Sequence, residues 1–98
     1  MTIKRIRTAS PKVLKDLRAL YRQLSTSGKR VAAATLKEAL YDKNVHLVGL
    51  FDKDRIVGTG TLIVFHPMEG TYALLDDVVV DISYRGRGFG KKLVQHLI

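Results

Sequence analysis

Hydrophobic side chains recur along the first third of the chain with the spacing of an amphipathic helix. Ser10 and Pro11 are an N-cap residue and a first-turn proline, so a helix is predicted to begin there and to end near residues 25–28. Strong helix formers over residues 30–42 predict a second helix. The apolar face of the first helix is expected to hold Val13, Leu14, Leu17, Leu20, Tyr21 and Leu24.

The pattern in most of the remaining chain is typical of strands. Residues 2–7 alternate apolar and charged side chains, whereas residues 45–51 are apolar on both faces, as in a central strand. Residues 55–65 and 72–81 are further apolar runs bounded by turns. Residues 88–98 return to helical spacing.

The predicted order is β-α-α-β-β-β-α, an α/β (α+β) fold with a mainly antiparallel sheet flanked by helices. Residues 1–98 contain no repeat or linker and are expected to form a single domain. The last helix is still apolar at Ile98 with no capping residue, so the domain is expected to be incomplete. Gly58 and Gly60 lie on one face of a strand and indicate a bulge, a close approach by a ligand or plain packing.

Composition narrows the class of protein. Hydrophobic residues make up 46% and charged residues 27% of the chain, the balance of a soluble globular protein. No apolar run is long enough to span a membrane, and no signal-peptide core follows the basic N-terminus. The lack of cysteine excludes disulfides and thiolate metal sites and fits a cytoplasmic protein, and the three histidines have no metal-ligand spacing.

The formal net charge of +8 falls on the first third of the chain. Residues 1–30 carry nine Lys and Arg against Asp16 alone, and residues 31–98 sum to zero. One hypothesis is a small basic module that binds nucleic acid or ribosomes through residues 4–30. Tyr21 is the only aromatic there for base stacking, which counts against it. A solvated helix face explains the charge about equally well.

Glycines and cations stand between a predicted strand and a predicted helix. The first turn of a helix has unpaired N–H groups and a positive dipole end, which together hold phosphate. Gly86, Gly88 and Gly90 let an anion approach the backbone. Neither the dinucleotide fingerprint nor the P-loop fits the spacing. The stretch predicts a phosphate or pyrophosphate cradle, with cations from Arg85, Arg87, Lys91 and Lys92.

The run Arg85-Gly86-Arg87-Gly88-Phe89-Gly90 fits the signature R/Q-x-x-G-x-G/A, and by it the chain resembles the GNAT family of N-acetyltransferases. The neighbouring residues are also similar to that family, because a valine-rich strand and Tyr84 precede the run and an amphipathic helix follows it. The upstream order of elements is also similar to that family. From Asp76 the segment resembles glucosamine-6-phosphate acetyltransferases as well.

The resemblance implies that acetyl-CoA is the co-substrate. Backbone groups of Val78, Val79 and Val80 would pair with its pantetheine arm as an added strand, with one N–H polarising the thioester carbonyl. The implied activity is direct transfer of acetyl to a primary amine of a small molecule or protein in a ternary complex, without a metal. The residues implied to wrap the pyrophosphate are Arg85, Gly86, Arg87, Gly88, Phe89, Gly90 and Lys91.

The attacking amine must lose a proton to a base or a water chain. Asp76 and Asp77 lie where the family often has an acid, and one of the two is the implied catalytic residue. Because side chains alternate along a strand, the pair is expected on opposite faces. The sequence leaves open which acid faces the site, and whether either has only a structural role.

The resemblance also sets limits on this chain. The tyrosine that protonates the thiolate in the family lies on a later helix, and neither Tyr72 nor Tyr84 matches it, so the chain alone is expected to be inactive. An uncovered sheet or helix predicts self-association. His66 lies in a loop that lines the acceptor site in the family, although a surface role is favoured. The basic helix over residues 11–24 favours an anionic acceptor by electrostatic steering.

Overall fold

The computed structural model describes residues 1–24 and 31–98. The predicted order of elements and the α+β class are confirmed. The second helix begins later than residue 30, and the predicted end of the first helix near residues 25–28 lies outside the described residues. The elements are β1 (Thr2–Arg5), α1 (Pro11–Leu24), α2 (Ala33–Tyr41), β2 (Val45–Asp52), β3 (Arg55–Phe65), β4 (Tyr72–Val80), a 3₁₀ turn (Ile82–Tyr84) and α3 (Phe89–Leu97).

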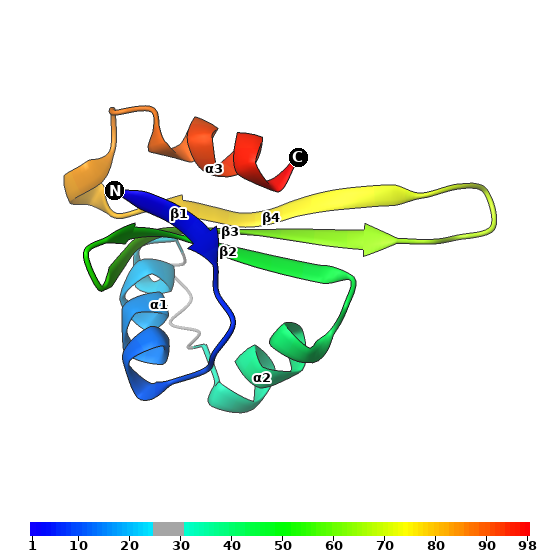
Figure 1. Cartoon of the computed structure of the whole chain (residues 1–98), viewed down its shortest axis with the longest axis horizontal. Coiled ribbons are helices and arrows are strands. Elements are labelled where there is room, and N and C mark those ends of the chain that lie inside the picture. The colour runs from blue at the N-terminus through cyan, green and yellow to red at the C-terminus, as the bar shows by residue number, and fades with distance from the viewer. Residues whose placement is uncertain (25–30) are drawn as a thin grey trace.

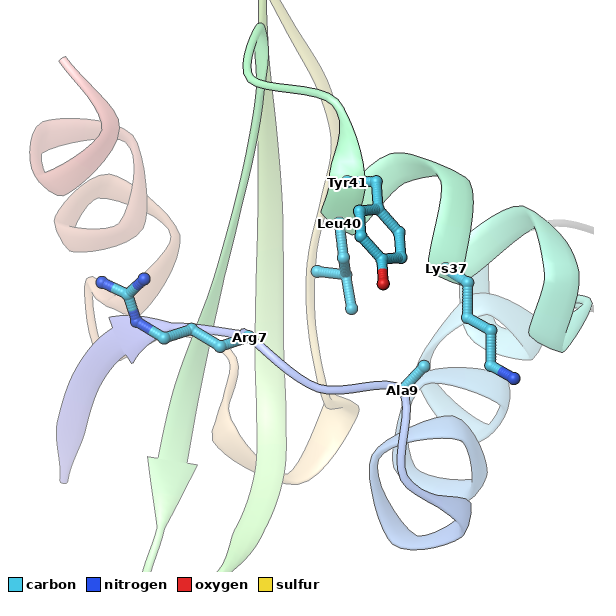
Figure 2. A pocket seen from close by; sticks show the side chains of 5 residues that line it. All are labelled: Arg7, Ala9, Lys37, Leu40 and Tyr41. Atoms are coloured by element: carbon cyan, nitrogen blue, oxygen red, sulfur yellow. The ribbon is translucent and has the colours of Figure 1, made fainter.

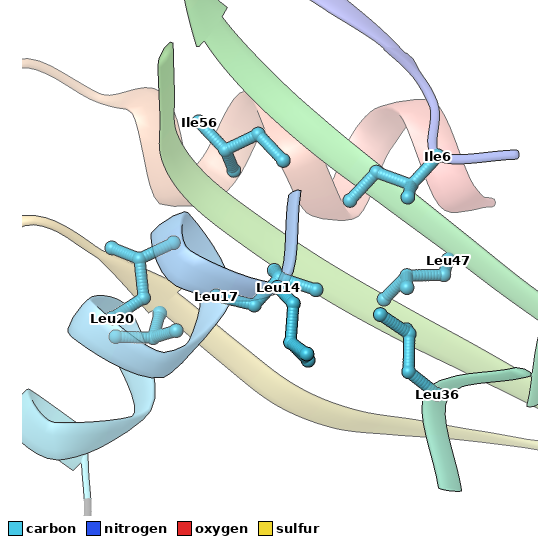
Figure 3. Packing of buried hydrophobic residues seen from close by; sticks show 8 residues of the cluster. Ile6, Leu14, Leu17, Leu20, Leu36, Leu47 and Ile56 are labelled. Carbon is cyan, nitrogen blue, oxygen red and sulfur yellow. The ribbon is translucent and has the colours of Figure 1, made fainter. Parts of the chain in front are cut away.

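The four strands form one antiparallel sheet in the order β1-β2-β3-β4. Helices α1 and α2 cover one face and α3 covers the other (Figure 1). A hydrophobic cluster lies on each face because β2 and β3 are apolar on both sides. Under α1 and α2 the buried residues are Ile6, Leu14, Leu17, Leu20, Leu36, Leu47, Ile56 and Val79 (Figure 3). Under α3 they are Val48, Leu50, Val57 and Leu93.

Helix α1 begins where the sequence predicts. The Ser10 hydroxyl accepts a hydrogen bond from Val13 N–H at 3.2 Å, which caps the first turn. Asp16, the single acid of residues 1–30, accepts a hydrogen bond from Ile56 N–H at 3.1 Å. A buried helix face and a carboxylate on the same helix therefore fix α1 against the start of β3.

Gly58 and Gly60 lie under α3, next to irregularities in the strand register. A Cβ atom at Gly58 would lie 3.2 Å from Leu50 Cβ and 3.3 Å from Leu93 Cδ1. A Cβ atom at Gly60 would lie 3.1 Å from Leu97 Cδ1. Two of the three interpretations therefore hold: both glycines lie beside an irregular register, as expected of a bulge, and both pack closely against residues of α3.

Strands β3 and β4 extend past the helices as a two-stranded arm (Figure 1). All residues from 71 to 77 are exposed. Large apolar side chains on the arm are also exposed, at Phe65, Tyr72, Leu74 and Leu75. None of the helices in the described part of the chain is long and apolar enough to cross a membrane.

Candidate active site

The glycine-rich loop connects the 3₁₀ turn to α3. Gly86 and Gly88 have φ values of 80° and 79°, a left-handed conformation that side chains with a Cβ rarely adopt. A Cβ at either position would have nothing within 4 Å, so backbone conformation rather than crowding requires these glycines. Gly88 is the N-cap of α3, and the first helical bond runs from Lys92 N–H to Gly88 O at 3.1 Å. The N–H groups before Lys92 have no partner within the helix, which is the feature that favours an anion.

Side chains around the loop are mostly exposed and cationic. Arg85, Arg87, Lys91 and Lys92 all lie at the surface, and Lys92 stands 5.6 Å from the Phe89 ring centroid. Phe89 itself packs against the cluster under α3, next to fully buried Leu93. The loop thus carries positive charge outward while its helix is fixed to the sheet by apolar contacts.

The edge of β4 leads directly into this loop. Asp81 N–H donates to Val57 O at 2.8 Å, so the Asp81 backbone faces β3. Neighbouring residues of a strand direct their backbone groups to opposite sides, so Val80 and Val78 face away from β3 and Val79 faces it. Arg85 Nε accordingly reaches Val80 O from the open side, at 2.9 Å. Of the three predicted valines, Val78 and Val80 present backbone groups at the edge, and Val79 is buried in the core.

Asp76 and Asp77 lie at a bulge in β4. Thr59 pairs with Val79 and Thr61 pairs with Asp76, so β4 has one residue more than β3 between these pairs. Asp77 has a φ of 52°, in the left-handed region, and its N–H donates to Asp76 Oδ1 at 3.0 Å. The expected strict alternation of the two acids is therefore wrong, because it assumes a regular strand.

Tyr21 of α1 brings an aromatic hydroxyl to the bulge. Burial, followed by the charge of Asp77 and to a lesser extent that of Asp76, raises the pKa of Tyr21 to about 12, while a hydrogen bond with Thr61 acts in the opposite direction. Burial and the charge of Asp76 also raise the pKa of Asp77 above its ordinary value. Two carboxylates and one phenol therefore share a single electrostatic environment on the α1 side of the bulge.

Comparison with known proteins identifies the family. A family profile described as "Acetyltransferase (GNAT) family" matches residues 12–98. The chain belongs to the GNAT acetyltransferase family. No curated protein is significantly similar to it.

Solved GNAT and other acetyltransferase structures share the fold of this chain. A putative acetyltransferase from Agrobacterium tumefaciens is 23% identical with a TM-score of 0.84, over 98% of this chain and 69% of that one. Glucosamine-6-phosphate N-acetyltransferase from Arabidopsis thaliana is 23% identical with a TM-score of 0.76, over 99% of this chain and 72% of that one. An aminoglycoside 6′-N-acetyltransferase complexed with coenzyme A is 25% identical with a TM-score of 0.77. The last match covers 99% of this chain and 53% of that one, so this GNAT chain spans about half the length of that protein.

Some contacts of this GNAT domain were not predicted from sequence. Gln23 of α1 donates through Nε2 to Asp81 Oδ2 at 3.2 Å, and its Oε1 accepts from Ile82 N–H at 2.9 Å. Asp81 also accepts from Ser83 N–H at 2.9 Å, and this backbone hydrogen bond is the main cause that lowers the pKa of Asp81. These bonds fix the chain where it leaves β4 for the glycine loop. The partners are far apart in sequence, so no local pattern indicates them.

Four hollows lined by described residues lie away from the predicted cofactor loop of this GNAT domain. A cavity of about 500 Å³ is lined by α2 and the segment joining β1 to α1, at Arg7, Ala9, Lys37, Leu40 and Tyr41. Figure 2 shows the Arg7 guanidinium extending away from Tyr41, so the cations do not converge on one point. The predicted site is instead an open strand edge and a loop, a shape that encloses little volume.

The three histidines lie at two separate places in the structure. His66 lies at the tip of the arm, where Nδ1 is 3.4 Å from the Thr71 hydroxyl, and it is exposed. His46 and His96, which are distant in sequence, line one cavity of about 240 Å³ on the α3 side. In the part of the chain that the structure describes, no three His, Cys, Asp or Glu side chains gather as a metal site.

Proposed function

We propose that this chain binds acetyl-CoA and takes part in the transfer of its acetyl group to a primary amine. The observation that carries the proposal is the continuity of one edge: the acidic bulge at Asp76 and Asp77, the outward backbone of Val78 and Val80, and the glycine loop follow one another along the chain. A ligand with a reactive group at one end and phosphates at the other matches this sequence of features. The coenzyme A bound by the aminoglycoside acetyltransferase relative supports the choice of ligand.

The phosphate end is proposed to bind the first turn of α3. Left-handed Gly86 and Gly88 leave the loop backbone open, and the surrounding arginines and lysines add positive charge. The pantetheine arm would add to the β4 edge by hydrogen bonds with Val78 and Val80. Arg85 Nε already donates to the Val80 carbonyl, which keeps a second lone pair for that pairing.

The proposed chemistry is direct transfer. The amine nitrogen bonds to the thioester carbonyl carbon, the carbon–sulfur bond breaks, and sulfur leaves with the electron pair. A protonated amine loses two protons overall, one through a base to solvent and one to the departing thiolate. Asp77 is the better candidate base of the two acids because its pKa is raised, which makes its carboxylate a stronger base than an ordinary aspartate. Asp76 and Tyr21 border the same place and would orient the incoming amine.

The acceptor is proposed to be a small molecule with a primary amine. An ammonium group is attracted to the Asp76 and Asp77 pair, whereas the basic outer face of α1 attracts anionic groups. Lys12 is paired with Asp16, at 3.3 Å, and Lys12, Lys15 and Arg22 are all exposed. An acceptor that carries both an amine and an anionic group, such as a phosphorylated amino sugar or an amino acid, fits both features.

Release of free thiol from acetyl-CoA tests this proposal. The chain is mixed with acetyl-CoA and a panel of amino sugars, amino acids, aminoglycosides and polyamines, with an amine-free reaction as the blank. Amine-dependent thiol release that falls in an Asp77→Asn variant supports the proposal. Coenzyme A binding without thiol release from any amine would limit this chain to the cofactor-binding role, which is the outcome expected if no other residue replaces the family's proton-donating tyrosine.

A further inference from the structure

Tyr84 connects the glycine loop to a distant turn of the sheet. It lies directly before Arg85, is half-buried, and packs against the hydrophobic cluster under α3. Its hydroxyl donates to Asp52 Oδ2 at 2.5 Å and accepts from Arg55 Nη2 at 3.3 Å. Asp52 ends β2 and Arg55 begins β3, so one phenol joins the β2–β3 turn to the start of the loop.

Two cations also lie near the ring of Tyr84. The Arg55 guanidinium carbon is 5.9 Å from the ring centroid, and that of Arg87 is 5.6 Å from it. Each guanidinium is attracted to the ring, but the two repel each other. The Asp52 carboxylate, bonded to the same hydroxyl, offsets part of this repulsion. Because Arg87 belongs to the glycine loop, its attraction to the Tyr84 ring also helps to set the position of a cation of that loop.

The glycines of the loop make no side-chain contacts that could hold it. Positions 86 and 88 carry no side chain, and a Cβ at either one would have no heavy atom within 4 Å. The position of the loop therefore depends on its ends. Phe89 and Leu93 fix the α3 end through apolar contacts. At the β4 end Tyr84 acts together with the hydrogen bonds of Gln23 and with the bond from Arg85 to Val80 O.

We propose that Asp52 is a positioning residue for the anion-binding loop and acts through Tyr84. This inference rests on the proposed function, because it assumes that the loop binds the phosphates of coenzyme A. Asp52 does not touch the ligand: it holds Tyr84, and Tyr84 holds Arg87 and the loop backbone in the conformation that receives the phosphates. Removing the carboxylate weakens binding of coenzyme A even though the loop sequence is unchanged.

Calorimetric titration of coenzyme A into the chain tests the inference. The variants are Asp52→Ala, Tyr84→Phe and the double variant, with Asp54→Ala, an exposed aspartate of the same turn, as the matched control. Each single variant is expected to raise Kd about fivefold. This loss is smaller than the full free energy of a hydrogen bond to a charged group, because Asp52 acts on binding only through Tyr84. The double variant is expected to bind about as weakly as either single variant, because both remove the same link. The control is expected to bind like the wild type.

Thermal melts of the ligand-free variants separate positioning from stability. A purely structural role would lower the melting temperature and leave Kd unchanged at a temperature well below the melt. That result, or independent losses that add in the double variant, would overturn the inference. A wild type that does not bind coenzyme A would overturn the proposed function instead, so the two failures are distinguishable.

Discussion

At the scale of single residues, the glycine loop and the acidic bulge both depend on left-handed backbone conformations. Gly86, Gly88 and Asp77 all have positive φ, and all lie in or beside the edge that runs from the bulge to α3. A left-handed residue other than glycine costs free energy, and such residues are concentrated at functional sites. Asp77 thus has a left-handed backbone at the bulge, and its charge helps to raise the pKa of Tyr21.

Substituting Gly88 by alanine is expected to weaken binding of coenzyme A strongly. Alanine at a φ of 79° shifts the backbone at the N-cap of α3 and costs about 1 kcal/mol of stability. Gly70→Ala is the matched control, since Gly70 also has a positive φ, 140°, but lies in the loop at the tip of the arm. Both variants should lose stability in denaturant titration, and only Gly88→Ala should lose binding. Equal binding by both would show that the loop conformation does not matter.

The raised pKa of Asp77 predicts a pH-dependent stability. Folding favours the protonated carboxyl, so this contribution is fully present below the ordinary aspartate pKa of 3.8 and is lost as pH rises through the folded value. Asp77→Asn should therefore be more stable than the wild type at neutral pH, by less than about 1 kcal/mol because the side chain is exposed. The difference should narrow in melts at pH below 3.8. A difference that stays constant with pH would mean that Asn simply tolerates the left-handed conformation better.

At the scale of elements, the sequence predicted the helices and strands because their patterns are local. Helical spacing of Leu14, Leu17 and Leu20 and the Ser10 cap are sufficient to place α1, and both are confirmed. The glycines of β3 indicate a bulge beside Gly60, where the register is irregular, but their pattern does not extend it to Asp76 and Asp77. Two adjacent aspartates are unusual in a strand, and aspartate tolerates positive φ, so a signal was present. Helical spacing places Tyr21 on the apolar face of α1 but does not indicate its interaction with Asp77, which depends on tertiary packing. The Tyr84–Asp52 link was missed for the same reason.

The attachment of α3 to the sheet depends mainly on Leu93, which is fully buried under that helix. Leu93→Ala is expected to cost about 2–4 kcal/mol of stability, measured by denaturant titration, because it opens a cavity between α3, β2 and β3. Ile98→Ala, at a side chain that is 87% exposed, should change stability by less than about 0.5 kcal/mol. A small effect of Leu93→Ala would contradict the packing of α3 described above.

At the scale of the whole molecule, the exposed arm predicts association between copies. Phe65 and Leu74 are 46% and 49% exposed on strands whose apolar side chains have no cover in the described structure. Sedimentation velocity should show concentration-dependent dimers or larger species. Phe65→Ser with Leu74→Ser should reduce them, whereas Met68→Ser at the arm tip should not. A wild type that remains monomeric at all concentrations would contradict this prediction.

The proposed function requires that this GNAT chain folds and that its β4 edge and glycine loop bind acetyl-CoA. The most direct measurement is the thermal melt of the chain with and without acetyl-CoA. A cooperative transition is expected to shift upward, by about 2.7 kcal/mol of added stability when the ligand is at a hundred times its Kd. A cooperative melt that acetyl-CoA does not shift would contradict cofactor binding, and the absence of any cooperative transition would contradict the fold itself.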